Sequence, residues 1–162
     1  MRSVRSHRLE RVQRVPRPLE ETFAFFTDAE NLEAITPPFL GFEIRTPRPI
    51  PMASGTLLDY RLRLFGVAFG WRTRIEVFEP NRRFSDVQLR GPYRRWHHLH
   101  EFHAVEGGTL VVDRVDYELP FGPLGWLAHA VFVRRTLAHI FDHRRRRIAH
   151  LLGGDAHDDA AA

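Results

Sequence analysis

Two histidines, His98 and His100, stand two positions apart in a segment from Tyr93 to Val105 whose alternating pattern predicts a strand. Side chains two positions apart on a strand leave the same face, with Cα atoms roughly 6.6 Å apart. Such a pair can hydrogen-bond a ligand, exchange protons near neutral pH, or bind zinc if a neighbouring strand supplies a third ligand. Asp86 and Asp113, in the segments before and after, are the carboxylates that would complete either kind of site.

The three uses of the histidine pair are not equally favoured. Histidines inside a protein are most often satisfied by a carboxylate or a carbonyl, so we expect His98 and His100 to line a cavity and contact a ligand. We therefore expect no metal, no other cofactor and no catalytic residue. If the protein is an enzyme, His98, His100 and Asp86 are the candidates for acid–base catalysis.

Strand alternation groups further side chains with the histidines. On the Tyr93–Val105 segment, Trp96 and Phe102 share their face, and the aromatic residues favour that face as the buried one. Similar alternation joins Asp86 to Gln88 on the preceding segment. The complete set that we expect to contact a ligand is Tyr60, Trp71, Asp86, Gln88, Trp96, His98, His100, Phe102, Asp113 and Tyr117.

Other kinds of chemistry find no support in the sequence. The chain contains no cysteine, which excludes disulfides, thiolate metal sites and a cysteine nucleophile. There is no Ser–His–Asp order or nucleophile elbow, and no glycine-rich loop between a strand and a helix that would cradle a phosphate. His139 and His143 lie one helical turn apart, but they lack a third ligand, so we expect no metal there.

The elements that must position these residues follow from periodicity. Residues 8–15 predict a first strand, Leu19 begins a helix after Pro18, and a second short helix runs from Asp28 to Ile35. From Phe42 to Leu119 the period is two, with turns that divide the run into five or six antiparallel strands. An apolar stripe then predicts one long helix from about Leu124 to Leu152.

This order predicts an α+β domain in which a curved antiparallel sheet wraps around the long C-terminal helix. At about 1.5 Å per residue the helix is long enough to cross the whole sheet. Because a strongly curved sheet and a straight helix do not close completely, we expect a cavity between them. We assign residues 1–152 to a single domain and residues 153–162 to a disordered tail.

Composition narrows the class of protein. With 43% hydrophobic and 27% charged residues the chain is typical of a globular protein, and no apolar run approaches the roughly 18 residues of a membrane span. The net charge is +4, but every basic residue is arginine and most are scattered, so we expect no nucleic-acid partner. Arg144 to Arg147 point in several directions on a helix and are expected to form a solvated face. The lack of cysteine leads us to expect a cytoplasmic protein.

Several segments together carry a resemblance to a known family; they include PLEETFAFFTDAENL, FSDVQLRGPYRRWHHLHEF, GGTLVVDRVDYELPFGPLG and FVRRTLAHIFDHR. With these segments the chain resembles, from about Leu9 to Leu152, the SRPBCC superfamily of START-like, helix-grip proteins, which includes polyketide cyclases/dehydrases and lipid-transfer domains. Within the superfamily it is similar to a bacterial ligand-binding subgroup found alone or fused to epimerase-like oxidoreductases. The resemblance implies a helix-grip fold with a cavity for a small, largely apolar molecule, and an oxidoreductase as a partner.

We therefore weigh three functions. The first is binding or transfer of a small hydrophobic or amphipathic ligand. The second is a cyclase/dehydrase-like enzyme that uses the cavity histidines for proton transfer. The third is an interaction module, for which a hydrophobic surface patch with a filled interior would be the signature.

Overall fold

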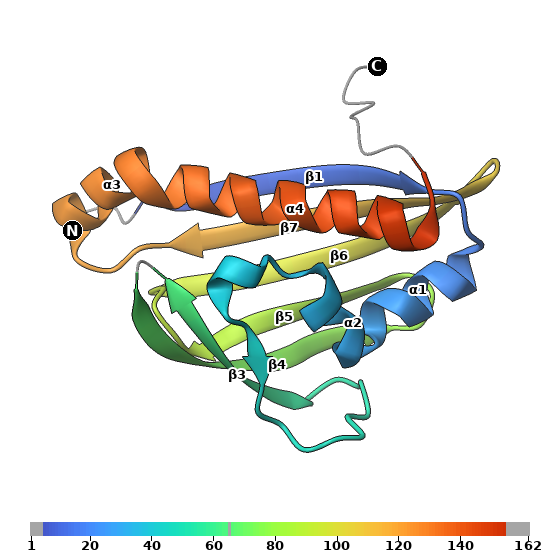
Figure 1. Cartoon of the computed structure of the whole chain (residues 1–162), viewed down its shortest axis with the longest axis horizontal. Helices are drawn as coiled ribbons and strands as arrows, with labels where there is room; N and C mark the ends of the chain where they lie inside the picture. The colour runs from blue at the N-terminus through green and yellow to red at the C-terminus, as the bar shows by residue number, and fades with distance from the viewer. Residues whose placement is uncertain (1–4, 65, 155–162) are drawn as a thin grey trace.

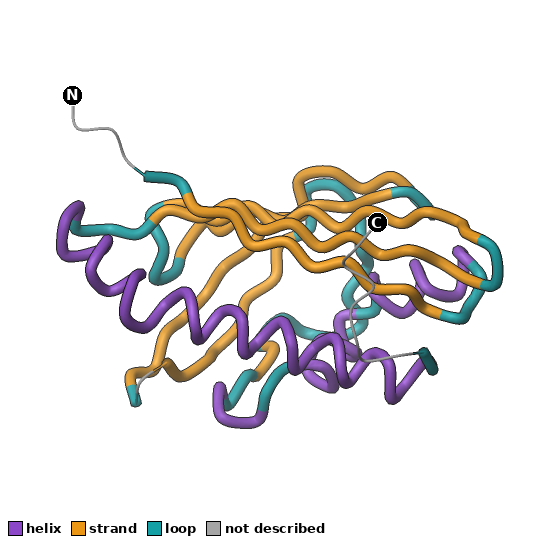
Figure 2. Tube along the Cα trace, turned by 90° about the horizontal axis from the view of Figure 1, so that it is seen from above, coloured by secondary structure: helices purple, strands orange, loops and turns teal. Residues whose placement is uncertain are grey.

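Seven antiparallel strands form one sheet, and the helices lie on one of its faces (Figures 1 and 2). This arrangement is that of a computed structural model, which describes residues 5–64 and 66–154. The strand order is β1-β7-β6-β5-β4-β3-β2. The elements are β1 (His7–Val15), α1 (Leu19–Thr27), α2 (Ala29–Ile35), a 3₁₀ turn (Pro38–Leu40), β2 (Glu43–Ile44), β3 (Leu57–Leu64), β4 (Val67–Glu79), β5 (Arg83–Arg90), β6 (Arg95–Val105), β7 (Gly108–Glu118), α3 (Gly122–Ala128), a π-helical turn (His129–Val133) and α4 (Arg134–Leu152).

The predicted α+β architecture of a curved antiparallel sheet and a long C-terminal helix is confirmed. The curvature has a local cause in the pairing of β4 with β5, whose register shifts between Arg72 and Thr73 and again between Ile75 and Val77. Such irregularities increase the twist of a strand. Figure 2 shows that β3 and β4 bend out of the plane of the other strands toward the long helix.

The long helix is divided by its π-helical turn and begins two residues earlier than the sequence pattern predicts, at Gly122. Its C-terminal part, α4, is attached to β1 and to the residues that follow this strand by hydrogen bonds between side chain and backbone. Gln13 Nε2 donates to the carbonyl of Arg145 at 2.9 Å, and Arg17 Nε donates to the carbonyl of Leu152 at 2.9 Å. These contacts fix the position of α4 across the sheet, and the second also satisfies a carbonyl at the end of the helix that has no partner within it.

Where α1 meets the sheet and the end of α4, the interior is filled. Phe23 of α1 lies against Phe102 of β6 with ring centroids 5.1 Å apart, and it also contacts Phe78 and Phe84 edge-on. Aromatic rings in this arrangement pack densely and exclude water. We call this region the packed end; its buried residues are Val15, Phe23, Ile35, Phe84, Phe102, Val111, Ile148 and Leu152.

Two predictions concern residues outside the described part of the chain. The expected disordered tail lies beyond it from residue 155 onward, and so does Phe65 in the expected turn between β3 and β4. Within residues 5–64 and 66–154, no helix combines the length and the apolar character needed to cross a membrane.

Candidate functional site

A cavity of about 210 Å³ lies between the concave face of the sheet and the helices. Its wall is largely apolar, with Leu58 and Leu62 of β3, Trp71 of β4, and Leu137 and Phe141 of α4. An apolar cavity of about 150 Å³ is known to hold benzene, so this space can enclose a molecule somewhat larger than one ring. We call this half of the interior the hollow end.

Four ionisable side chains form a buried group beside the cavity, which we call the Asp–His cluster: Asp86, His98, His100 and Asp113. Register explains why they meet, because Asp86 of β5 pairs with His98 of β6, and His100 of β6 pairs with Asp113 of β7. Side chains directly opposite on neighbouring strands lie closest, and diagonal neighbours remain within reach. The two histidines therefore lie between two carboxylates, and each is only 4% exposed.

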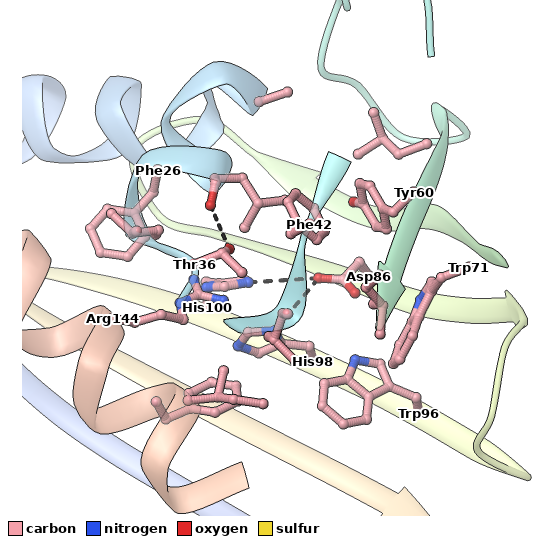
Figure 3. Close-up of a pocket in the computed structure, with 18 of the residues that line it drawn as sticks. Phe26, Thr36, Phe42, Tyr60, Trp71, Asp86, Trp96, His98, His100 and Arg144 are labelled. Carbon is pink, nitrogen blue, oxygen red and sulfur yellow. Dashed lines mark hydrogen bonds and ion pairs between the residues drawn. The ribbon is translucent and has the colours of Figure 1, made fainter. Parts of the chain in front are cut away.

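Each histidine of the cluster lies close to both carboxylates. On one side, Asp113 Oδ1 lies 2.6 Å from His100 Nδ1 and 3.3 Å from His98 Nε2. On the other side, Asp86 Oδ2 lies 3.6 Å from His100 Nε2 and 3.8 Å from His98 Nδ1, the two interactions drawn in Figure 3. The imidazole rings are 3.8 Å apart between centroids.

The environment separates the protonation of the two histidines. Burial, helped by the charge on His100, lowers the pKa of His98 to about 4. Burial also acts to lower the pKa of His100, but the negative charges of Asp113 and Asp86 outweigh it, so that the pKa is raised. The pKa values of two neighbouring imidazoles are thus displaced in opposite directions.

The carboxylates of the cluster are held ionised. Burial acts to raise the pKa of Asp113, yet the charge and hydrogen bond of His100 outweigh burial and hold that pKa well below its usual range. The same balance lowers the pKa of Asp86. Two ionised carboxylates thus lie at the edge of an apolar cavity, where low polarity strengthens their effect on a ligand.

Four of the expected ligand contacts besides the histidines lie where a ligand can touch them. Tyr60, Trp71, Asp86 and Trp96 line the cavity together with His98 and His100, and Figure 3 shows them gathered around it. Trp71 and Trp96 meet edge to face with centroids 5.2 Å apart. Asp113 does not itself line the cavity, but it lies directly behind the two histidines that do.

Three other expected contacts lie away from the cavity wall, and each has a structural role instead. The Gln88 amide exchanges hydrogen bonds with the backbone N–H and carbonyl of Tyr93, which closes the turn between β5 and β6. Phe102 belongs to the packed end. The Tyr117 hydroxyl lies 2.8 Å from His129 Nε2, between β7 and the long helix. The prediction that these side chains contact a ligand in the cavity is therefore not supported by their positions.

Sequence reasoning missed Arg144, which lines the cavity instead of belonging to a solvated face. Its guanidinium lies over the Phe141 ring at 5.3 Å, and its Nε is buried without a hydrogen-bond partner among the described residues. The signal was present, because Arg144 follows Leu137, Ile140 and Phe141 at helical spacings of seven, four and three. Phe26 of α1, and Thr36 and Phe42 from the segment between α2 and β2, are also among the lining residues that were missed.

Comparison with known proteins places the chain in a defined group. The sequence pattern of the family described as polyketide cyclase/dehydrase and lipid transport matches residues 15–140. A search of curated proteins gave no match to the chain.

Solved structures share the fold at low sequence identity. An aromatase/cyclase, Zhui from Streptomyces sp. R1128, is 16% identical and superposes with a TM-score of 0.64 over 91% of this chain and 96% of its own. TTHA0849 from Thermus thermophilus is 20% identical, with a TM-score of 0.65 over 91% and 97%. Ara h 8.0201 is 15% identical, with a TM-score of 0.67 over 91% and 98%. At these identities the likeness shows a common fold.

Proposed function

The chain belongs to the polyketide cyclase/dehydrase and lipid-transport family, and from this premise we propose that it binds a small amphipathic molecule in the cavity between sheet and long helix. The apolar part of the molecule would lie against Trp71, Leu62 and Leu137. Its polar part would meet Asp86, the two histidines and Arg144. Family membership supports binding of a hydrophobic ligand or cyclase-like chemistry in general. Of these two functions we propose ligand binding, in this cavity.

The observation that carries the proposal is the contrast between the walls of the hollow end. Most of the lining is aromatic and aliphatic, while Asp86, His98 and His100 form one ionisable group on the sheet, as Figure 3 shows. Burial of apolar surface contributes about 5 kcal/mol for each ~200 Å² removed from water, before the costs of binding. The polar side then orients the molecule and discriminates among ligands of similar size.

Arg144 supports a ligand with an acidic or hydrogen-bond-accepting group. Its Nε is a buried donor without a partner among the described residues, and such a donor is costly unless a ligand accepts from it. A carboxylate, phenolate or ketone oxygen would satisfy it. His100 also lines the cavity and its pKa is raised, so its imidazole is a second group that can donate to such an oxygen.

The test is recovery of the bound molecule together with a variant that fills the cavity. Native mass spectrometry of the purified protein, followed by extraction, identifies what the chain carries. Leu137→Trp puts a larger side chain into the wall, and we expect the bound molecule to be lost or its affinity to fall at least ten-fold. Leu151→Trp is the matched control, since Leu151 lies on the same helix, is exposed and does not line the cavity. Equal occupancy in the two variants would contradict the proposal.

A cyclase/dehydrase-like enzyme is the second candidate, and the Asp–His cluster favours it. His98, whose pKa is lowered to about 4, and His100, whose pKa is raised, are a candidate proton acceptor and a candidate proton donor, with their rings 3.8 Å apart beside the cavity. Aldol cyclisation and dehydration need both. Turnover of a β-hydroxyketone probe that is lost in His98→Asn and His100→Asn, with ligand affinity retained, would support this candidate over simple binding.

The third candidate, an interaction module, is less well supported because the interior is hollow. The start of the long helix does expose a patch of large apolar side chains, including Phe121, Leu124 and Trp126. A patch together with a filled interior would be the signature of that function, and only the patch is present.

A further inference from the structure

The two sides of the histidine pair differ in distance. On the side of Asp113, Oδ1 lies 2.6 Å from His100 Nδ1 and 3.3 Å from His98 Nε2. On the side of Asp86 the separations are 3.6 Å from His100 Nε2 and 3.8 Å from His98 Nδ1, both too long for a direct hydrogen bond. Asp86 Oδ2, His98 Nδ1 and His100 Nε2, each able to donate an electron pair to a metal ion, thus face one another across a gap.

The size of this gap suits a metal ion. Two ligands bound at about 2.1 Å to a tetrahedral divalent ion lie about 3.4 Å apart, close to the observed separations. The ligand atoms of Asp86, His98 and His100 all lie within 4.8 Å of one another. We propose that Asp86 Oδ2, His98 Nδ1 and His100 Nε2 bind a divalent transition-metal ion.

The groups behind these ligands have the arrangement that metal sites require. Ligating histidines commonly donate their second ring N–H to a carboxylate, which fixes the ring and the tautomer. Asp113 Oδ1 lies beside the second nitrogen of both His98 and His100. The Thr73 hydroxyl lies 3.0 Å from the carbonyl of Val87 and 3.3 Å from Asp86 Oδ1, and Asp86 Oδ2 is the oxygen that faces the histidines. Asp113 is therefore the group behind both histidines, and Thr73 lies beside Asp86.

Position in the fold and charge also agree with a metal. The three ligands lie on the paired strands β5 and β6, which hold side chains more rigidly than loops do. The two carboxylates, Asp86 and Asp113, carry two negative charges that a divalent ion and neutral histidines would balance inside the protein. All three ligands also line the cavity, so a remaining coordination position would face a bound molecule.

Two nitrogen ligands and one oxygen ligand suit zinc, iron(II), cobalt(II) and similar ions better than magnesium or calcium, which prefer oxygen alone. The site does not depend on the identity of the organic ligand. It can therefore be tested with the metal alone, and its failure would leave the proposed ligand binding intact.

The experiment uses the full chain without a histidine tag, stripped of metal with a chelator. Zn²⁺ is titrated by calorimetry and Co²⁺ by visible absorption. We expect one ion per chain with micromolar or tighter affinity. Asp86→Asn and His98→Asn should each weaken binding more than 100-fold. Asp113→Asn, which alters only the group behind the ligands, should weaken it 10- to 100-fold.

The control is the double variant His139→Ala and His143→Ala, a histidine pair one turn apart on α4 and away from the cluster. It should bind Zn²⁺ as the unaltered protein does. If the cluster variants fail to fold, ¹⁵N NMR of the unaltered protein decides, because Zn²⁺ must shift the ring nitrogens of His98 and His100 and leave those of His139 in place. Absence of stoichiometric uptake, or uptake lost only in the control variant, would overturn the proposal.

Discussion

The same three strands build a solid interior at one end and a hollow one at the other. At the packed end β5, β6 and β7 contribute Phe84, Phe102 and Val111. Two positions away on each strand, on the same face, they contribute Asp86, His100 and Asp113. The difference lies in what covers them, because Phe23 of α1 fills the space above the first set.

The comparison teaches that the cavity is not a simple failure to pack. The packed end shows that this sheet and helix can be filled when an aromatic side chain from a further element is inserted. At the hollow end Asp86 and His100 instead face the space and Asp113 lies behind the histidines, at a cost that buried charges always carry. Stability is thus concentrated at one end, and the capacity for chemistry at the other.

The largest expected effect is at the packed end. Phe102→Ala should lower the free energy of unfolding by about 3–5 kcal/mol, because a buried ring in contact with three others is removed. Urea denaturation measures this loss. Binding of the cavity ligand, extrapolated to the folded fraction, should not change. A loss below about 1 kcal/mol would show that the packed end is not the more stable region.

The next effect is a dependence on pH that belongs to the hollow end. The pKa of His98 is lowered to about 4 in the folded protein, from an ordinary 6.5, so the unfolded chain takes up a proton first as the pH falls. Stability should therefore decrease between pH 6.5 and 4, by about 3 kcal/mol at 1.36 kcal/mol per pH unit.

The other members of the cluster act in different pH windows. The raised pKa of His100 gives stability that is complete below pH 6.5 and lost only as the pH rises through the folded value. The lowered pKa of Asp113 gives stability that is lost only below the ordinary aspartate value. His7, His129 and His143 also have lowered pKa values, so denaturation of metal-free protein across pH 4 to 6.5 reports His98 by difference. The slope should decrease in His98→Asn and stay unchanged in Phe102→Ala.

A smaller difference should separate two positions on one helix. Ile148 and Leu137 are both buried on α4, but Ile148 belongs to the packed end and Leu137 borders the cavity. Leu137 has fewer neighbours to lose on its open side, so Leu137→Ala should cost about 2 kcal/mol and Ile148→Ala about 4 kcal/mol. Equal losses by chemical denaturation would mean that the cavity closes in solution.

The smallest effect is expected on the outer face of the sheet. Arg72 donates two hydrogen bonds to Asp59, at 2.8 and 3.1 Å, across the β3–β4 pair. Because solvent screens an exposed ion pair, Arg72→Ala should leave the thermal midpoint unchanged within error. A clear decrease would show that the hollow end depends on its outer surface more than on its interior.

The sequence predicted the fold well because periodicity is a local property. The alternation of β6 placed His98 and His100 on one face, and the stripe on the last segment gave the long helix. Register is not local, since the pairing of His98 with Asp86 and of His100 with Asp113 depends on turn lengths and bulges. Alternation therefore indicated the members of the cluster without their arrangement.

The residues that were misplaced show the limits of the same reasoning. Gln88 has the parity of a cavity residue, but its amide is occupied by the backbone of Tyr93 at the strand end. Tyr117 likewise finds its partner, His129, on a helix whose position no sequence pattern sets. Arg144 belongs both to a charged run and to the apolar stripe that it continues, and only the packing of α4 distinguishes the two.

The pairing of the first strand with the last has a consequence for how the chain folds. Arg8 of β1 and Asp116 of β7 are 108 residues apart, so β1 has no partner until nearly the whole sheet has been synthesised. Contacts this distant close slowly, because a long loop must be ordered before they form. The last helix in turn docks on β1. The cavity therefore comes into existence only at the final step, and whatever molecule it holds can join only a finished chain.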